Sequence, residues 1–428
     1  MFKAVIQKKL EGYVKKYFKR HPEVKLVVIA GSVGKTSTKM AIATVLAERY
    51  RVRLHEGNHN SELSAPTAIL GIAFPDNLRS AGQWREVFKA AKKRINDPTD
   101  VDIIIQELGT DGVGQIPHFG TYLKPDLAVI TAVSAEHMEM FKTLDAVATE
   151  ELAAANFSKS ALINRDDIDG AYAADLTNAN ISTYGTTEAA EYYFVEDDFS
   201  LKEGIKGSFV ALDWDDPVET HLKVLGESSV RAVVAAGAVG VKMGLTSDEV
   251  KNGLKKISSV SGRMNVLRGV RDTVIIDDSY NSSPLAVKSS LQTLYSLSVP
   301  QKIAVLGSMN ELGDLSTEAH TEAGKLCDPS QLAYVITVGE DAQKYLAPAA
   351  QANGCQVVSF KSPLEAGAFV HKTMESGAAV LFKGSQGGIY LEEAIKIVLH
   401  STEEQSRLVR QSSRWMAIKQ KFFDSLAK

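Results

Sequence analysis

A short glycine-rich segment near the N-terminus carries the residue types that bind nucleotide phosphates. Residues 31–38 read GSVGKTST and stand between an apolar stretch, residues 26–30, and a segment with helical spacing. Glycines at such a turn let backbone N–H groups face phosphate oxygens, and the N-terminus of the following helix adds its positive end. Lys35 would neutralise the β- and γ-phosphates, and the Thr36 hydroxyl would hold magnesium. The segment predicts an ATP site formed by Gly31, Ser32, Gly34, Lys35, Thr36 and Ser37.

The segment departs from the standard phosphate-loop pattern at one position. That pattern has a glycine five residues before Gly34, where this chain has Ile29. We still interpret the segment as a phosphate loop, because an apolar strand precedes it and a helix follows it.

Two further side chains follow neighbouring apolar strands and extend the phosphate site. Glu107 stands at the end of the strand expected at residues 101–105, and His137 follows the strand expected at residues 127–131. Because the carboxyl ends of parallel strands meet at one edge of a sheet, both should lie beside the phosphate loop. Carboxylate oxygens suit Mg²⁺, which shares its ligands with nucleotide phosphates. Glu107 is the expected carboxylate ligand. His137 is a candidate for the same metal site because it is expected to lie beside Glu107 and the phosphate loop, although a lone histidine more often has a packing role.

Apolar strands and helices alternate around these residues, which predicts a first α/β domain with a mainly parallel sheet. Residues 190–225 instead contain segments with period-two alternation, which predicts antiparallel strands before a helix at residues 229–243. The strands predicted for this domain are 26–30, 101–105, 127–131, 161–164, 208–214 and 219–225.

A second series of strands and helices predicts another doubly wound domain, with the boundary near Gly262 and Arg263. The predicted fold class is therefore α/β: a central phosphate-loop ATPase domain with a mainly parallel sheet, followed by a C-terminal Rossmann-like domain. The predicted segments are a basic amphipathic helix at 1–23, the central domain at 24–262 and the C-terminal domain at 263–428. The strands predicted for the C-terminal domain are 273–278, 302–307, 333–339, 356–360 and 379–383.

Length and composition are typical of a multidomain globular protein. The chain has 428 residues, and its longest uncharged apolar run, residues 232–241, is shorter than the roughly 20 residues that span a bilayer. The formal net charge is -4, so the basic surplus of a nucleic-acid-binding protein is absent and small anionic substrates are expected. Two cysteines are too few for a disulfide framework, and the N-terminal residues lack the apolar run of a signal peptide. These features predict a cytoplasmic protein.

Two segments combine apolar residues at helical spacing with many lysines and arginines. They are residues 2–18 and residues 82–95. We expect each to be an amphipathic helix packed on the body of the protein. A membrane-surface role stays open for both, and the second could also act as a lid or bind the donor substrate.

Seven ordered blocks of sequence match one known family from about Val24 to the C-terminus. The blocks are residues 31–38, 57–66, 107–109 with 135–139, 261–264, 277–284, 304–313 and 383–385. They resemble the Mur ligases of peptidoglycan synthesis, and most of all the members that add D-alanyl-D-alanine. The resemblance implies a central ATPase domain and a C-terminal domain that closes over it, preceded by a domain that binds a UDP-sugar. It also implies an ADP-forming ligase that uses ATP and Mg²⁺ to convert a carboxylate into an acyl phosphate, which an amine then attacks.

The resemblance implies roles for single residues as well. Lys35 and Thr36 are expected to bind phosphates and magnesium, while Glu107 and His137 hold metal. Arg263 is expected to reach the ATP phosphates from the domain boundary.

On the C-terminal side of the site, the resemblance implies that Asp278 holds the ribose, with Asn281 nearby. The resemblance also implies substrate contacts from both the central and the C-terminal domain. The contacts from the C-terminal domain are expected to be with the incoming amine. The residues concerned are Asn58, Asn60, Ser61, Lys383 and Ser385.

The chain departs from the family pattern in three places. Only residues 1–23 precede the central domain, so the UDP-binding domain is expected to be missing. The donor, a nucleotide-linked or lipid-linked peptide, would then need the two basic segments or a partner protein. The segment 75–102 is longer than expected. Glu227 to Ser229 replace a His-Asn pair near the adenine and Gln386 replaces an arginine, so base recognition is expected to differ.

Glu151 marks a further difference from several Mur ligases. Those ligases carry a lysine on the helix after the metal-binding histidine, and its carbamate helps to hold a second magnesium. Counting from His137, that position is Glu151, and no lysine occurs between Lys142 and Lys159. A glutamate already supplies carboxylate oxygens, so Glu151 is predicted to hold metal without bicarbonate. The alternative is that Glu150 and Glu151 lie on a solvated helix face.

The favoured function is an ATP-dependent amide ligase with small-molecule carboxylate and amine substrates of the D-alanyl-D-alanine type. One alternative is a related ligase with another acceptor, of the polyglutamate or lipid-linked cell-wall type. The other is a nucleotide-binding partner protein without turnover. The complete set of candidate catalytic residues speaks against the second alternative.

Overall fold

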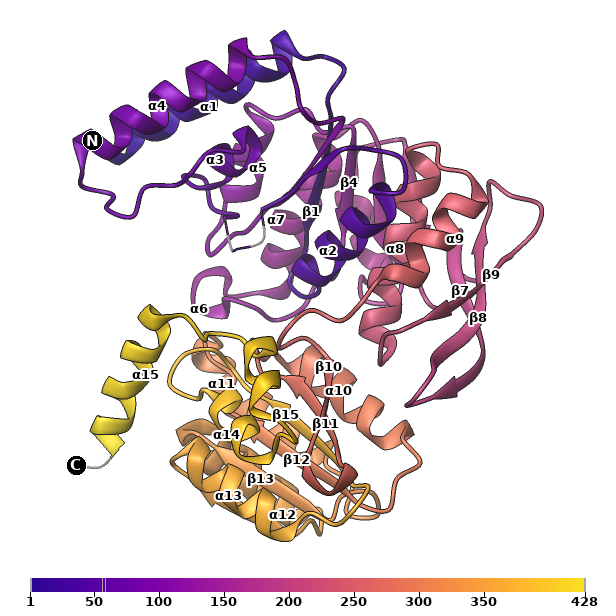
Figure 1. Ribbon diagram of the computed structural model, residues 1–428, viewed down its shortest axis with the longest axis vertical. Helices are drawn as coiled ribbons and strands as arrows, with labels where there is room; N and C mark the ends of the chain where they lie inside the picture. The colour runs from indigo at the N-terminus through magenta and orange to yellow at the C-terminus, as the bar shows by residue number, and fades with distance from the viewer. Residues whose placement is uncertain (1, 56, 58, 427–428) are drawn as a thin grey trace.

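The computed structural model describes residues 2–55, 57 and 59–426 and consists of two α/β units, one above the other in Figure 1. The upper unit contains a nine-stranded sheet, and the lower unit contains a six-stranded sheet. The chain passes from one to the other between α9, which ends at Lys256, and β10, which begins at Asn265. This architecture confirms the predicted fold class.

The upper sheet has the order β2-β3-β1-β4-β5-β6-β7-β8-β9. Neighbouring strands from β2 to β7 are parallel, and β8 and β9 continue the edge as antiparallel strands. The four central strands are short apolar runs, as expected for strands covered by helices on both faces. The strands are β1 (Lys25–Ala30), β2 (Val52–Arg53), β3 (Ile103–Glu107), β4 (Leu127–Ile130), β5 (Ala161–Asn164), β6 (Ile181–Tyr184), β7 (Tyr192–Ser200), β8 (Gly204–Ala211) and β9 (Val218–Leu222).

Several strand boundaries differ from the sequence predictions, and those of β3 and β8 have a clear local cause. Strand β3 begins at Ile103 rather than Val101, because Asp102 lies at its start and its carboxylate accepts a hydrogen bond from the Arg51 backbone N–H at 2.8 Å. Strand β8 ends at Ala211, where the Trp214 N–H donates to the Ala211 carbonyl at 3.1 Å and closes a turn. The first shift makes Glu107 the last residue of its strand.

Helices cover both faces of the upper sheet. One face carries α2 (Lys35–Leu46), α8 (Glu227–Lys242) and α9 (Ser247–Lys256), which share one apolar core with the strands. Gly253 allows α9 to lie against α2, since an added Cβ would come within 2.7 Å of the Val45 Cα. The other face carries a second core beneath α1 (Phe2–Arg20), α3 (Ala65–Leu70), α4 (Ala81–Asn96), α5 (Gln115–Gly120) and α7 (Leu144–Asn156).

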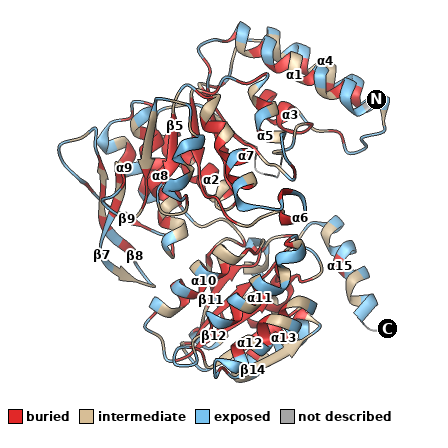
Figure 2. Ribbon diagram, turned by 180° about the vertical axis from the view of Figure 1, so that it is seen from behind, coloured by how far each residue is buried: buried red, intermediate tan, exposed pale blue. Residues whose placement is uncertain are grey.

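The two basic segments form α1 and α4, which lie side by side at the end of the upper unit away from the lower unit (Figure 1). Tyr13 and Phe88 join them, with ring centroids 6.1 Å apart. Figure 2 shows buried residues on their inner sides and exposed residues outside. Both helices are therefore packed on the protein, as expected. Among the described residues, no helix is both long and apolar enough to cross a membrane.

The lower sheet has the order β10-β11-β15-β12-β13-β14, in which only β10 runs antiparallel to its neighbour. Helix α15 (Ser413–Leu426) projects from this unit at the C-terminus (Figure 1). The remaining elements are β10 (Asn265–Arg268), η2 (Val270–Asp272), β11 (Val274–Asp278), α10 (Pro284–Ser296), β12 (Lys302–Gly307), η3 (Gly313–Leu315), α11 (Ser316–Lys325), β13 (Tyr334–Val338), η4 (Ala342–Leu346), α12 (Ala347–Ala352), β14 (Val357–Phe360), α13 (Pro363–Thr373), β15 (Ala379–Lys383), α14 (Leu391–Val398) and η5 (Thr402–Arg407).

The packing of α1 predicts a large effect of truncating Leu10, which is fully buried. We expect Leu10→Ala to lower the free energy of unfolding by about 2–5 kcal/mol, because it removes buried apolar surface and leaves a cavity. Denaturant unfolding followed by circular dichroism measures this change. Val5→Ala on the same helix is the control, because Val5 is 62% exposed and its truncation should change stability by less than about 0.5 kcal/mol. Equal effects of the two variants would contradict the packing.

Candidate active site

A cavity of about 350 Å³ lies between the two units and is lined by residues of both. Most of the predicted site residues meet there, although they come from distant parts of the sequence. Gly31, Glu151 and Ser385 do not line it, and Asn58 lies outside the described residues. The predicted residues that line the cavity are Ser32, Gly34, Lys35, Thr36, Ser37, Asn60, Ser61, Glu107, His137, Arg263, Asp278, Asn281 and Lys383.

The phosphate loop connects β1 to α2 at the carboxyl edge of the upper sheet. Gly31 and Gly34 have φ angles of 124° and 90°, which glycine adopts readily. An added Cβ on Gly31 would lie 2.3 Å from the Thr131 hydroxyl oxygen, so the loop can lie against β4 only with glycine there. Ile29, which occupies the first glycine position of the standard pattern, is a buried residue of β1. The tight turn therefore begins two residues later than in that pattern.

Lys35 is the first residue of α2, and its ammonium group folds back over the loop. It donates to the carbonyls of Gly31 and Ser32, and Glu136 lies 3.7 Å away. Burial acts to lower the pKa of this ammonium, but three nearby carboxylates outweigh the effect and hold the pKa above its usual value. Lys35 is therefore charged and suited to a phosphate. The carboxylates are those of Glu136, Glu151 and Glu107.

Thr36 and Glu107 form the part of the site that fits Mg²⁺. The Thr36 hydroxyl donates to Glu107 Oε2 at 3.1 Å, and Lys39 lies 3.3 Å from the same oxygen. Burial acts to raise the pKa of Glu107, but the positive charges of Lys39 and Lys35 lower it below its usual value. Glu107 is therefore an anionic oxygen donor beside the phosphate loop, and phosphates and water would supply the remaining ligands. Among the described residues, no three His, Cys, Asp or Glu side chains form a complete metal-binding group.

His137 lies on the same rim but contacts the lower unit. Its Nδ1 is 2.9 Å from Glu311 Oε2, and its Nε2 is 3.9 Å from Glu136 Oε1. The hydrogen bond with Glu311 raises the pKa of His137 above its usual value. In this arrangement the imidazole links the two units, and its predicted role as a metal ligand stays a prediction.

Glu151 lies beneath the phosphate loop rather than on an exposed helix face. Its Oε2 accepts a hydrogen bond from the Gly31 N–H at 2.6 Å, and burial raises the pKa of its carboxyl to about 7. Glu150 is equally buried and accepts hydrogen bonds from the Gly114 and Ile116 N–H groups. The alternative of two solvated glutamates is therefore wrong. The metal-binding role of Glu151 stays a prediction.

Residues of the lower unit complete the cavity opposite the phosphate loop. Arg263 donates from Nη2 to the Thr36 hydroxyl oxygen at 3.1 Å and stacks on the Tyr280 ring, with its Cζ 4.2 Å from the ring centroid. Asp278 ends β11 and accepts hydrogen bonds from the Met264 N–H and the Ser290 hydroxyl. Arg263 thus reaches the phosphate loop from the domain boundary.

The predicted substrate residues differ in their surroundings. Asn60 donates to Glu107 Oε1 at 3.3 Å, and Ser61 bonds to the Ser64 hydroxyl at 2.9 Å. Lys383 is buried between Asp278, at 3.0 Å, and the Asn281 carbonyl, at 2.6 Å. It therefore lies on the expected ribose side of the site.

Ser385 is buried, and its hydroxyl accepts a hydrogen bond from the Asn310 N–H at 2.9 Å. It supports the loop that carries Glu311 and has no place on the cavity wall.

Sequence reasoning missed several charged residues in and around the site, among them Lys39, Glu136 and Glu311. Lys39 stands four residues after Lys35 on α2, so helical spacing could have found it. Glu136 directly precedes His137, and its negative charge was the only feature of the sequence that could have identified it as a site residue. Glu311 belongs to the sequence block 304–313, but its contact with His137 depends on how the units meet.

Two family models match the chain in consecutive segments. The Mur ligase middle domain matches residues 29–240, and the glutamate ligase domain of the Mur ligases matches residues 262–386. Together they cover most of both units, including the phosphate loop and the residues that line the cavity between the units. The chain belongs to the Mur ligase family.

Individual relatives within this family are similar to the chain over most of its length. The UDP-N-acetylmuramoyl-tripeptide–D-alanyl-D-alanine ligase of Bacillus subtilis (strain 168) is 27% identical over 382 residues, covering 88% of this chain and 76% of the relative. The ligase of the same name from Synechocystis is 26% identical over 366 residues, covering 85% and 72%. The crystal structure of the MurF ligase from Thermotoga maritima in complex with ADP has a TM-score of 0.73 at 22% identity, covering 91% of this chain and 83% of that one. This last likeness shows a shared fold.

The buried carboxyl of Glu151 predicts a pH-dependent effect of Glu151→Gln. An unfolded glutamate has a pKa of about 4.3, whereas the folded value is about 7, so the folded protein holds the extra proton between these values. The parent therefore loses stability as pH rises from about 4.3 to about 7, because the unfolded chain releases this proton while the folded protein keeps it. Above pH 7 the folded protein releases the proton too, and the loss of stability levels off. A glutamine keeps an acceptor for the Gly31 N–H without that cost. We expect the variant to melt at a higher temperature than the parent at pH 8, and at the same temperature at pH 4.

Glu150→Gln is the matched control, because its two backbone hydrogen bonds need both carboxylate oxygens. It should melt below the parent at both pH values. A Glu151→Gln variant that melts below the parent at both pH values as well would contradict the assignment.

Proposed function

We propose that the protein is an ATP-dependent ligase that joins a peptide carboxylate to the amine of D-alanyl-D-alanine, or a closely similar amine, in the synthesis of cell-wall precursors. One observation carries the proposal: the phosphate loop of the upper unit and Arg263 and Asp278 of the lower unit line the same cavity. Membership in the Mur ligase family supports the reaction class, and the names of the relatives support the acceptor.

The chemistry requires that a carboxylate become an electrophile. Transfer of the γ-phosphoryl group to a carboxylate oxygen gives an acyl phosphate and ADP, and attack by the amine then forms the amide and releases phosphate. The protein contributes charge neutralisation and positioning to both steps. The loop N–H groups and Lys35 would hold the β- and γ-phosphates. Arg263 would face the transferred group from the other unit, because it already reaches Thr36.

Thr36 and Glu107 would hold magnesium, because their oxygens are of the kind this ion prefers. When bound, it neutralises charge on the β- and γ-phosphates. Lys39 would keep Glu107 ionised and oriented, since it lies 3.3 Å from Oε2 and donates to the His55 carbonyl at 2.8 Å. Asp278 would accept hydrogen bonds from the ribose hydroxyls.

The base would lie where Ser228, Ser229 and Arg231 line the cavity. Arg231 is held by Asp166 at 3.0 Å and Asp167 at 3.4 Å, so its charge is already balanced. The serine hydroxyls therefore remain for polar contacts with the base, in place of the histidine and asparagine of related ligases.

The identity of the donor, and how the protein attracts it, is the more specific part of the proposal. A nucleotide-linked and a lipid-linked peptide both carry phosphate, and the exposed lysines of α1 and α4 offer the opposite charge. We infer that the lysine-rich helices α1 and α4 together attract the phosphate-bearing donor. The protein would bind the donor in the cytoplasm by itself, at a membrane surface, or together with a partner protein. Purified protein with each donor in turn separates these cases.

Lys35→Ala is expected to abolish phosphate release with ATP, a muramyl-tripeptide donor and D-alanyl-D-alanine, since it removes the cation beside the transferred phosphoryl group. Steady-state phosphate release and mass analysis of the product measure the reaction, with the UDP-linked and lipid-linked donors compared in parallel. Lys25→Ala is the control: Lys25 is an exposed lysine at the other end of β1.

The control should retain the parent rate, and both variants should melt near the parent temperature. Turnover by Lys35→Ala at the parent rate would refute the site. If the parent released phosphate only with a different amine, the related-ligase alternative would replace the proposed acceptor.

A further inference from the structure

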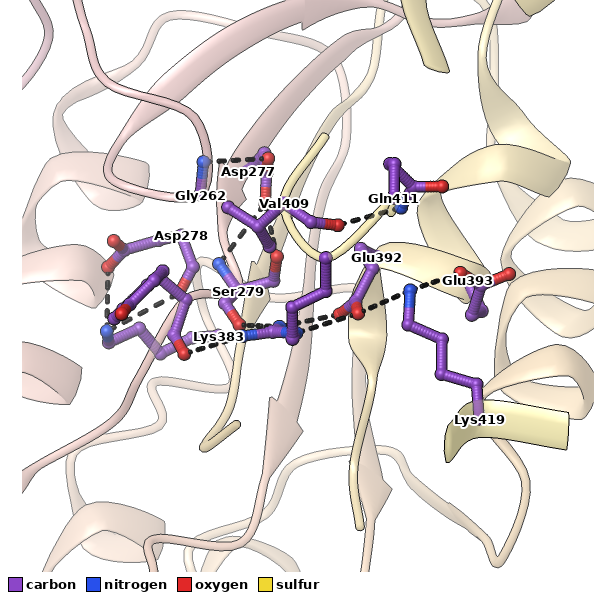
Figure 3. A network of polar contacts seen from close by, with 12 residues as sticks. Gly262, Asp277, Asp278, Ser279, Lys383, Glu392, Glu393, Val409, Gln411 and Lys419 are labelled. Atoms are coloured by element: carbon purple, nitrogen blue, oxygen red, sulfur yellow. Dashed lines mark hydrogen bonds and ion pairs between the residues drawn. The ribbon is translucent and has the colours of Figure 1, made fainter. Parts of the chain in front are cut away.

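A buried ion network joins the C-terminal segment of the chain to the backbone beside the cavity (Figure 3). Arg410 donates from Nε and Nη2 to the two carboxylate oxygens of Glu392, at 2.8 and 2.6 Å. Lys419 of α15 lies 2.8 Å from Glu392 and 2.7 Å from Glu393. Glu392 is fully buried and Lys419 is 1% exposed, so these charges depend on one another rather than on water.

Two further hydrogen bonds from Arg410 go to backbone carbonyls next to the nucleotide side of the site. Its Nη2 donates to the Ser279 carbonyl at 2.7 Å, and its Nη1 donates to the Tyr280 carbonyl at 3.0 Å. These residues follow Asp278, the last residue of β11. Arg410 itself has a φ of 57°, a conformation that a non-glycine residue rarely adopts without strong contacts. The guanidinium fork therefore fixes both its own backbone and that of residues 279–280.

Tyr280 carries this support to the phosphate loop. Its ring lies against the Arg263 guanidinium at 4.2 Å, and its N–H donates to the Gly262 carbonyl at 3.0 Å. Arg263 in turn donates to Thr36 in the upper unit. A continuous set of contacts thus leads from the C-terminal segment to the place where the ATP phosphates are expected.

We propose that Arg410 is a positioning residue for ATP: it holds the backbone of residues 279–280 so that Tyr280 supports Arg263 against the phosphates. Lys419 assists by neutralising Glu392 and Glu393 together, which couples α15 to the nucleotide site. A lysine at position 410 would keep the charge but lack the planar fork that serves Glu392 and both carbonyls at once. The inference rests on the proposed function, because Arg263 and Asp278 are assigned to ATP there.

Arg410→Lys tests the proposal in the full-length protein. We expect a roughly 2- to 30-fold rise in the KM for ATP, with the KM values for the donor and the amine unchanged. The dissociation constant for ADP with Mg²⁺, measured by calorimetry without turnover, should rise as well. Arg407→Lys is the matched control: Arg407 ends η5 in the same segment, its side chain is half exposed, and its bonds go to Glu404, Asn265 and Val266. It should leave both quantities unchanged.

A double-mutant cycle with Arg263→Ala separates positioning from general loss of stability. If Arg410 acts through Arg263, then Arg410→Lys should change ADP affinity much less in the Arg263→Ala background. Equal changes in both backgrounds, or a lowered melting temperature with unchanged ADP affinity and ATP KM, would overturn the proposal. Lys35→Ala distinguishes this failure from failure of the function: if it removes nucleotide binding while Arg410→Lys matches Arg407→Lys, only the positioning role is wrong.

Discussion

The mutual neutralisation of buried charges around the phosphate loop is the constraint on which the rest of the site depends. A buried charge is costly unless it is paired and hydrogen-bonded, so each cation near the loop has a protein partner in this structure. Lys35 has Glu136 and two loop carbonyls, Lys39 has Glu107, and Arg263 has the Thr36 hydroxyl. Incoming phosphates would replace some of these partners. The site is therefore balanced for an anionic ligand, and the raised pKa of Lys35 and the lowered pKa of Glu107 are consequences of that balance.

The parallel sheet makes this concentration of charge possible. Strand β1 lies between β3 and β4, with Ile29 opposite Glu107 and Ala30 opposite Ile130. The loops that follow the three strands therefore emerge together at one edge. The lower unit adds Arg263 and Glu311 across the cavity, so two polar contacts between the units, Arg263 to Thr36 and Glu311 to His137, involve side chains assigned to ATP or metal. Binding of substrate and the approach of the two units are linked through the same side chains.

Much of this arrangement could be predicted from local sequence. The strand, glycine turn and helix around Lys35 identify the phosphate loop, and Glu107 follows from its place at the end of the next strand. Long-range contacts left no such signal. The link from His137 to Glu311 and the fork of Arg410 join residues whose separation in sequence has no periodicity, and they depend on how the units meet. Glu151 was expected beside a metal, but its burial under Gly31 depends on the close approach of α7 to the loop.

The most direct test of the central claim follows the oxygen atoms of the donor. A donor peptide whose reacting carboxyl group carries ¹⁸O is incubated with protein, ATP, Mg²⁺ and D-alanyl-D-alanine, and the released phosphate is analysed by mass spectrometry. An acyl-phosphate ligase leaves one donor oxygen on the phosphate, so each amide formed should yield one phosphate that contains ¹⁸O. Amide formation accompanied by phosphate without ¹⁸O would contradict phosphoryl transfer to the carboxylate and with it the proposed chemistry of the site.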